Sequence, residues 1–248
     1  MKKNLIKIYD LLLTITLFLM KWIFFKFRKR GPENMPFTSK FLKKIGLYPI
    51  IKHYYDPKFD YSNSEKKIYL DRNLKSIKLN IDYQLDLLEK FNFKDELIDL
   101  NLNNGSKDFN FCFNNGSFEK GDAEIYYQMI RHFKPKKVIE VGSGHSTLIA
   151  MEAIKKNKNE NIETAMKCIE PYENMWLEKF NLEILREPLE KTKLNWNDEL
   201  NKNDIFFLDS SHIIRPDGDV LKFYLEILPK LKSGVIIHIH DIFTPKNY

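Results

Sequence analysis

A ten-residue stretch near the middle of the chain, residues 138–147, constrains the fold most, and it reads Val-Ile-Glu-Val-Gly-Ser-Gly-His-Ser-Thr. The β-branched residues before Gly142 favour a buried strand, and Gly142 and Gly144 permit a tight turn with close backbone approach. The apolar residues that follow, up to Ile154, predict a helix that begins near Ser146 or Thr147. A strand, a glycine turn and a helix in this order open a nucleotide-binding α/β unit.

This turn departs from a dinucleotide-binding fingerprint in two respects. Thr147 stands where the third glycine would be, and the strand carries an acid, Glu140. A carboxylate repels a phosphate but attracts a cationic ligand. The segment resembles the first motif of the class I S-adenosylmethionine-dependent methyltransferases, acid-x-Gly-x-Gly. The resemblance implies that Glu140, Gly142, Ser143 and Gly144 lie at the cofactor, with the acid beside its methionine end.

Strand and helix patterns alternate from residue 138 onward. Strands are expected at 138–141, 165–170, 182–186, 204–209 and 235–241, and helices at 146–154, 175–180 and 217–232. This alternation predicts an α/β fold with a Rossmann-like, doubly wound, mainly parallel sheet between two layers of helices. An N-terminal helical or irregular extension precedes it.

The region before this sheet contains weaker patterns. A helix is expected at 82–91 and a strand at 109–113, and another helix begins at Asp122. Asp122 and Glu124 are explained either by helix capping or by contact with the cofactor. The aromatic segment 48–57 is interpreted as an arm packed over the domain, with an acceptor-binding lid as the alternative.

Acidic residues end four of the expected strands. Glu140, Glu170, Asp209 and Asp241 therefore fall at the carboxyl edge of the sheet, where ligands bind in such folds. A Rossmann-type site holds the ribose hydroxyls with an acid at the end of the second strand, which assigns that role to Glu170.

Two further segments extend the resemblance. Asp209-Ser-Ser-His212 and the His240-Asp241 pair resemble a methyltransferase subfamily with Asp-x-x-His after the fourth strand and an acid after the fifth. Several of these relatives are metal-dependent O-methyltransferases of sugars and other small molecules. The resemblance implies that Asp209 contacts the cofactor and takes part in catalysis. It also implies that Asp209 and Asp241 hold a divalent cation such as magnesium, and that His212 removes the acceptor hydroxyl proton. His240 stands where such relatives often have an acid, so a metal-free reaction through His212 is the alternative.

The N-terminal segment is apolar and flanked by basic residues. Leu11 to Met20 carries no charge, Lys21 interrupts the run, Trp22 to Phe25 continues it, and Lys26 to Arg30 closes it. Three interpretations remain: a short transmembrane anchor, an interfacial helix with Trp22 at the headgroups, and an apolar helix packed on the domain. We expect membrane contact through residues 5–30 and a cytoplasmic catalytic domain anchored to the inner membrane. No small-residue cleavage site follows the apolar run, which argues against a removable signal peptide.

The chain is long enough for one sizeable α/β domain and an extension. It has 248 residues and a net charge of +6, much of it near the N-terminus, and no zinc-finger or RNA-binding signature, so a nucleic-acid partner is not expected. Cys112 and Cys168 lack metal-type spacing and are expected as unpaired thiols. Asn-Gly-Ser at Asn104 and Asn115 is interpreted as turns rather than as glycosylation sites. We divide the chain into an N-terminal helix at 1–30, a cap at 31–120 and the cofactor-binding core at 121–248.

The chain ends at Tyr248, just past the fifth expected strand. The methyltransferase fold normally adds a sixth strand and an antiparallel seventh, and their loss would expose a sheet edge. We therefore expect either a C-terminally truncated product or coverage of that edge by another subunit, such as a second copy of the chain.

The leading functional hypothesis is an S-adenosylmethionine-dependent methyltransferase that acts on a hydroxyl of a small molecule or sugar. One alternative is a nicotinamide-dependent Rossmann oxidoreductase, against which Thr147 and the Asp209–His212 segment argue. The other is a non-catalytic, membrane-associated binding protein that retains only the fold, and the short C-terminus keeps this alternative open.

Overall fold

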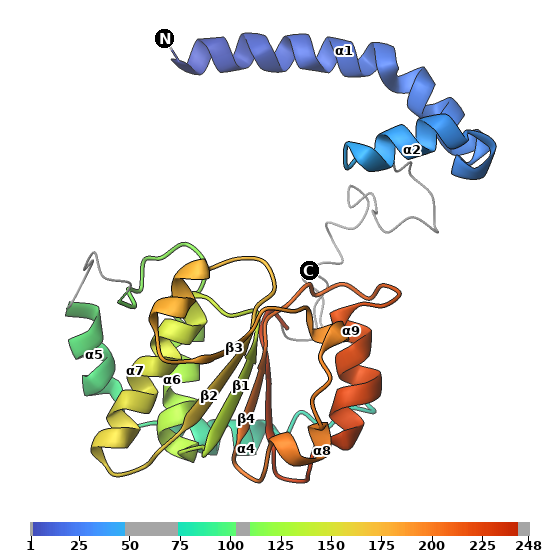
Figure 1. Ribbon diagram of the computed structural model, residues 1–248. Coiled ribbons are helices and arrows are strands. Elements are labelled where there is room, and N and C mark those ends of the chain that lie inside the picture. Colours follow the sequence, from blue (N-terminus) through green and yellow to red (C-terminus); the bar gives the residue numbers. More distant parts are fainter. Residues whose placement is uncertain (1, 48–73, 103–109, 243–248) are drawn as a thin grey trace. The chain divides into compact units, whose positions relative to one another are not determined.

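The chain is divided between two units in the computed structural model, which describes residues 2–47, 74–102 and 110–242 (Figure 1). The first unit comprises residues 1–73 with 245–248, and the second comprises residues 74–244. The boundary falls inside the region 31–120 that the sequence analysis treats as a cap. The aromatic segment 48–57, Asn104 and the last six residues lie outside the described residues.

Three helical elements make up the described part of the first unit. α1 (Lys2–Arg30) is a single helix of 29 residues and is followed by η1 (Pro32–Asn34) and α2 (Pro36–Lys44). Gly31 adopts φ +83°, a left-handed conformation that glycine takes without steric cost and that ends α1. Asn34 Nδ2 donates to the carbonyl oxygen of Arg30 at 2.7 Å, which satisfies one terminal carbonyl.

The second unit is built on one sheet. Its strands are β1 (Lys137–Val141), β2 (Ala165–Ile169), β3 (Glu183–Leu185), β4 (Ile205–Leu208) and β5 (Ile236–Ile239). Their order is β3-β2-β1-β4-β5, and every neighbouring pair is parallel. The predicted Rossmann-like parallel sheet is confirmed. The strand order reverses between β1 and β4, and such a switch point leaves a crevice at the carboxyl ends of the two strands.

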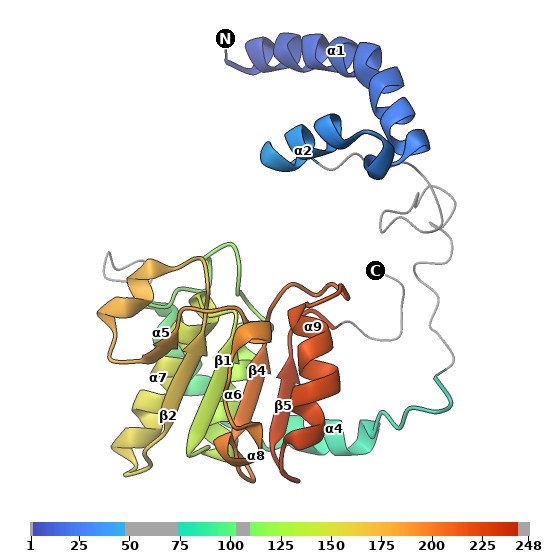
Figure 2. The same ribbon diagram turned by 45° about the vertical axis from the view of Figure 1, so that its right-hand side comes forward.

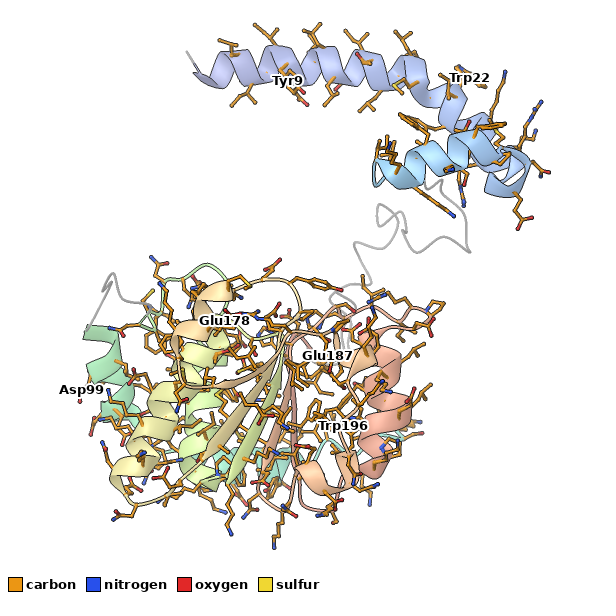
Figure 3. All side chains as sticks on the ribbon, in the orientation of Figure 1. Tyr9, Trp22, Asp99, Glu178, Glu187 and Trp196 are labelled. Atoms are coloured by element: carbon orange, nitrogen blue, oxygen red, sulfur yellow. The ribbon has the colours of Figure 1, made fainter. Side chains whose placement is uncertain are left out.

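Helices cover both faces of this sheet (Figures 1 and 2). α5 (Lys94–Leu102), α6 (Asp122–Phe133) and α7 (His145–Asn159) lie on one face, which receives the fully buried Val138, Cys168 and Phe207. The other face receives Ile139, Ile169 and Phe206. That face is covered by α8 (Trp196–Glu199), which carries Trp196 (Figure 3), and by α9 (Asp219–Lys222) with its continuation. Alternate strand residues therefore pack on opposite helix layers, as the pleat of a strand requires.

A buried arginine joins three helical segments of the first layer. Arg131 on α6 is 2% exposed, and its guanidinium donates to Glu96 of α5 at 2.9 Å, and to Asn157 and Glu160 at the end of α7. The guanidinium carbon also lies 4.5 Å from the centre of the Phe93 ring. Each charged group is paired, so its burial is compensated.

The segment before α6 differs from the prediction. The strand expected at 109–113 is wrong, because residues 110–113 pair with no strand. Phe111 and Phe113 are nevertheless buried, which accounts for the alternating pattern. Asn115 holds the loop instead: its Nδ2 donates to the carbonyl oxygens of Cys112 at 2.8 Å and Phe118 at 2.7 Å. Its Oδ1 accepts from the backbone amides of residues 117 and 118.

The remaining helix predictions are correct in position but not always in type. α4 (Ile81–Glu89) confirms the helix expected at 82–91. The helix expected at 175–180 is the 3₁₀ element η3 (Met175–Lys179). The long helix expected at 217–232 begins as α9, widens into the π-helical η5 (Phe223–Ile227) and ends as the 3₁₀ element η6 (Leu228–Lys230).

Candidate functional site

The glycine turn after β1 is packed against the end of β4. Gly142 has φ +82°, and a Cβ there would stand 1.6 Å from the carbonyl oxygen of Asp209, while the Asp209 amide donates to Val141 O at 2.9 Å. A Cβ on Gly144 would stand 2.9 Å from Asn174 Nδ2, which donates to Ser143 O at 2.9 Å. Both glycines therefore serve close backbone approach, as their spacing predicts.

The helix after the turn begins one residue earlier than predicted, at His145. Thr147 Oγ1 accepts from the Gly144 amide at 3.0 Å and so satisfies a donor in the turn that precedes the helix. Ser143 is 2% exposed, between the two glycines.

Glu140 lies fully buried beneath this turn. Its Oε1 accepts from Ser146 Oγ, and its Oε2 has no hydrogen-bond partner among the described residues. Burial raises the pKa of Glu140 to about 8, the hydrogen bond from Ser146 lowers it, and the charges of Asp209 and Glu170 raise it further. Glu140 is thus a carboxyl group whose ionisation a nearby cation would favour.

Glu170 organises the loop after β2. Its Oε1 accepts from the backbone amides of Tyr172 at 3.0 Å and Glu173 at 2.9 Å. Arg186 holds the same loop from the other side, because its Nη1 donates to the carbonyl oxygens of Glu170 at 3.0 Å and Glu173 at 2.8 Å. No described residue bonds the second carboxylate oxygen, Oε2, so it is available to a ligand. Tyr172 is 78% exposed at the edge of this loop.

A cavity of about 390 Å³ opens at the carboxyl ends of β1, β2 and β4. Its volume is that of a small-molecule site. Five acids and one base line it: Glu170, Glu173, Glu190, Asp209, Asp219 and Arg215. Its remaining lining is largely apolar or backbone, with Gly142 at the switch point between β1 and β4. An excess of carboxylates makes the cavity attractive to a cation and repellent to a phosphate.

Asp209 links this cavity to a cluster of polar side chains. Its Oδ1 lies 3.1 Å from His212 Nε2 and 3.3 Å from His240 Nδ1. Asp241 Oδ2 lies 3.6 Å from the same His212 nitrogen and 3.7 Å from His240 Nδ1. The loops after β4 and β5 therefore bring the predicted Asp209, His212 and Asp241 together, with His240 among them.

Backbone strain accompanies this convergence. His212 and Asp241 both have φ +56°, a left-handed conformation that costs a non-glycine residue on the order of 1–3 kcal/mol. Such strained residues concentrate at functional sites, because the surrounding structure must hold them in place.

His240 sits between three carboxylates. Its Nε2 lies 3.4 Å from Asp122 Oδ2, so Asp122 reaches this cluster from the first turn of α6. Asp209 raises the pKa of His240 to about 9, against the effect of burial, and Asp241 and Asp122 add to the rise. Neither ring nitrogen is aligned for a hydrogen bond, so these contacts are electrostatic.

The donor set fits a divalent metal ion. Asp209, His240 and Asp241 each offer one ligand atom, and these atoms lie within 4.8 Å of one another. One imidazole with two carboxylates suits manganese, iron or zinc, whereas magnesium prefers oxygen ligands alone. The imidazole nitrogen of His240 is thus a third candidate ligand beside the two predicted ones, Asp209 and Asp241.

The structure separates the predicted cofactor residues into two groups. Gly142, Glu170 and Asp209 line the cavity, whereas Glu140, Ser143 and Gly144 do not. Glu190, Arg215 and Asp219 line it without having been predicted as site residues. Glu190 lies in the 3₁₀ helix η4 (Leu189–Lys191), Arg215 in the loop after β4, and Asp219 at the start of α9, all outside the strand ends. The only sequence signal near them was the acid-rich stretch 187–190 and the Asp217–Asp219 helix start.

Comparisons with known proteins find similarity for part of this chain. Residues 139–242 match the model of a methyltransferase domain family. Over 97 residues the chain is 40% identical to an uncharacterised protein of Archaeoglobus fulgidus, and the match covers 37% of this chain and 43% of that relative. The chain thus spans less than half of that relative's length.

One solved structure is similar to half of the chain. It is a Plasmodium falciparum protein assigned as a protein-L-isoaspartate O-methyltransferase, in complex with S-adenosyl-L-homocysteine. The identity is 18%, the match covers 49% of this chain and 60% of that one, and the TM-score is 0.30.

Proposed function

We propose that the second unit, whose residues 139–242 match the model of a methyltransferase domain family, binds S-adenosylmethionine and transfers its methyl group to a hydroxyl of a small molecule or sugar. The observation that carries the proposal is the acid-lined cavity at the switch point, where Gly142, Glu170 and Asp209 meet. A sulfonium cation is stabilised by that lining, whereas the pyrophosphate of a nicotinamide cofactor would face five carboxylates.

Within the cavity, each end of the cofactor has a partner. The second oxygen of Glu170 accepts from the ribose hydroxyls while the first keeps its bonds to the loop amides. The apolar side chains of Ile169 and Leu189 offer a surface for the adenine ring. The sulfonium then lies toward Asp209, beside the polar cluster.

Asp209 and His212 supply the proton chemistry. With its Nε2–H donating to Asp209 Oδ1, His212 keeps Nδ1 unprotonated and able to accept a proton. The acceptor hydroxyl oxygen forms a bond to the methyl carbon, the carbon–sulfur bond breaks with its electron pair going to sulfur, and the hydroxyl proton passes to His212. S-adenosylhomocysteine and a methyl ether are the products.

A divalent cation at Asp209, His240 and Asp241 is a second part of the proposal. When bound, it would lower the pKa of an acceptor hydroxyl. The chain's own residues would hold it from two strand ends, and Asp209 would be shared between the cation and the cofactor cavity. A metal-free reaction through His212 is the competing form of the same activity.

Calorimetric titration with S-adenosylmethionine tests the proposal. Glu170→Gln keeps an oxygen for the loop amides but loses the charge and the second acceptor, so affinity should fall about tenfold or more, as a lost charge-assisted hydrogen bond implies. Glu163→Gln is the matched control, since Glu163 is 76% exposed and paired only with Lys158 among the described residues. Binding of NAD in place of S-adenosylmethionine would contradict the proposal. Binding without turnover over a broad acceptor screen would favour a non-catalytic binding protein.

A further inference from the structure

α1 exposes apolar side chains on every side. Leu12, Leu17 and Phe18 are 59%, 53% and 69% exposed although they point in different directions around the helix. Tyr9 and Trp22 project from it (Figure 3). The most apolar 18-residue window within Leu5–Arg30 has a mean hydropathy of 1.8, and none of that window is buried. A helix that is apolar all round and uncovered is suited to hydrocarbon rather than to water.

The polar groups within α1 are compatible with a lipid environment. Thr14 Oγ1 donates to Asp10 O at 2.8 Å and Thr16 Oγ1 donates to Leu12 O at 2.9 Å, so both hydroxyls are satisfied inside the helix. Leu5 to Phe25 spans roughly 30 Å at 1.5 Å per residue, which matches a bilayer core. The charged residues within this span, Lys7, Asp10 and Lys21, lie toward its two ends, where the long lysine side chains reach the headgroups.

α2 is a second amphipathic element of the same unit. Phe37, Phe41 and Ile45 follow one another at intervals of four residues and are 90%, 61% and 54% exposed. Lys40 and Lys44 flank this apolar row, and Lys43 lies on the opposite side of the helix. Leu42 is its only buried residue. A short basic helix with an exposed aromatic face is the form that lies in a membrane interface.

Positive charge is unequal across α1. Three lysines precede the apolar run, at positions 2, 3 and 7. Seven basic residues follow it, Lys26, Arg28, Lys29, Arg30, Lys40, Lys43 and Lys44, against one acid, Glu33. The more basic flank of a spanning helix stays in the cytoplasm, where the anionic leaflet attracts it.

We propose that the first unit is a two-part anchor for an anionic bilayer. α1 crosses the membrane with its N-terminus outside, and α2 lies in the plane of the cytoplasmic leaflet. Phe37, Phe41 and Ile45 enter the acyl boundary, and Lys40, Lys43 and Lys44 contact anionic headgroups. The proposal is independent of the methyltransferase activity.

The in-plane position of α2 is tested by fluorescence in the full chain. Phe41→Trp places a tryptophan on the apolar face, and Lys43→Trp places one on the opposite, basic side as the matched control. Both variants are reconstituted into vesicles containing about one third phosphatidylglycerol and lipids brominated near the headgroup end of the acyl chain. The tryptophan at position 41 should be quenched about twofold more than that at position 43, and its quenching should be weaker in purely zwitterionic vesicles. Equal quenching at both positions, or equal quenching in both lipids, would overturn the role of α2.

The spanning topology of α1 is tested in bacterial cells that express the full chain. The chain should stay in the membrane fraction after alkaline carbonate extraction, whereas a Leu13→Glu/Leu17→Glu variant should be released. An N-terminal tag should be labelled from outside intact spheroplasts, and a C-terminal tag only after lysis. Release of the unaltered chain by carbonate, the reverse labelling pattern, or a mature mass that lacks residues 1–30 would overturn the anchor.

Discussion

The carbonyl oxygen of Asp209 occupies the place where a side chain at position 142 would begin. A Cβ on Gly142 would stand 1.6 Å from that oxygen and 2.8 Å from the Asp209 carbonyl carbon. The backbone of the turn after β1 therefore packs directly against the backbone at the end of β4. Since Asp209 also contacts His212 and His240, the same backbone contact positions the polar cluster.

Gly142→Ala should unfold the second unit far more readily than a glycine replacement elsewhere. The left-handed φ costs about 1–2 kcal/mol in any L-residue, and the overlap with Asp209 adds about 1–3 kcal/mol. Gly116→Ala is the matched control, because Gly116 has φ +80° but no atom within 4 Å of the new Cβ. Urea denaturation of both variants measures the difference, and equal losses would show that the close approach has no energetic weight.

Glu140→Gln should stabilise the protein at alkaline pH. The folded-state pKa of Glu140, about 8, lies above its ordinary value of 4.5, so the folded state holds the proton more tightly. Stability from this group is present below about pH 4.5 and is lost as pH rises toward 8, at about 1.4 kcal/mol per pKa unit. Glutamine keeps an acceptor for Ser146 and carries no charge.

The measurement for this prediction is the free energy of unfolding at pH 5.5 and pH 8.5. The advantage of Glu140→Gln over the parent should grow between the two by an amount on the order of 1 kcal/mol or more. Glu163→Gln, at an exposed site, should show no such growth. A pH-independent difference for Glu140→Gln would mean that the carboxyl group ionises normally in the fold.

Arg131→Met should destabilise the second unit by about 3–5 kcal/mol, because the change leaves Glu96 and Asn157 without their buried partner. Lys134→Met removes the other cation that binds Glu160, but Lys134 is 40% exposed and its loss should cost less than about 1 kcal/mol. Denaturant unfolding of the two variants separates the buried pair from the surface pair. Similar costs would contradict the burial argument.

His212→Gln should abolish most methyl transfer while leaving cofactor binding intact. Loss of a general base lowers kcat by about 10²–10⁴-fold. The affinity for S-adenosylmethionine should change less than about twofold, because His212 does not line the cavity. Calorimetry and single-turnover kinetics measure the two quantities separately, and a parallel loss of both would assign His212 a structural role.

The relative affinity of the site for Mn²⁺ and Mg²⁺ should depend on the residue at position 240. The parent chain should bind Mn²⁺ about tenfold or more tightly than Mg²⁺, since one of its three donors is an imidazole nitrogen. His240→Asp should narrow that ratio by supplying a third oxygen donor. Calorimetric titration with each ion gives the ratio, with Asp198→Asn, an exposed site, as the control. An unchanged ratio in His240→Asp would exclude residue 240 as a ligand.

The strands were predictable because parallel strands buried on both faces appear as short apolar runs. Phe206 and Phe207 illustrate this: they are adjacent, both fully buried, and face opposite helix layers. The type of the last helix was not predictable from periodicity, which does not distinguish α from π or 3₁₀ turns. Pro229 lies in the final 3₁₀ turn and cannot donate a helical hydrogen bond, so the helix ends before the expected Lys232.

The sequence predicted that the site lies at the carboxyl edge of the sheet. It did not predict to which face of the sheet each side chain at that edge points. Val141 lines the cavity, and the two-residue period of a strand then turns Glu140 to the opposite face, toward Ser146 on α7. Glu190 reaches the cavity from a short 3₁₀ helix and Arg215 from a loop, and no periodic pattern in the sequence describes either segment. The contact of Asp122 with His240 depends on tertiary packing between α6 and β5.

The hydrogen bonds of Asn115 decide whether glycosylation at this residue can report on which side of a membrane the domain lies. An N-linked glycan replaces one hydrogen on Nδ2, and in the folded loop both hydrogens are engaged, by Cys112 O and Phe118 O. The Asn115-Gly-Ser acceptor is therefore closed once the loop has formed, and a glycan attached earlier would break one of these bonds. An unglycosylated Asn115 is thus what the folded loop requires in either compartment, and it carries no information about which side of a membrane the domain occupies.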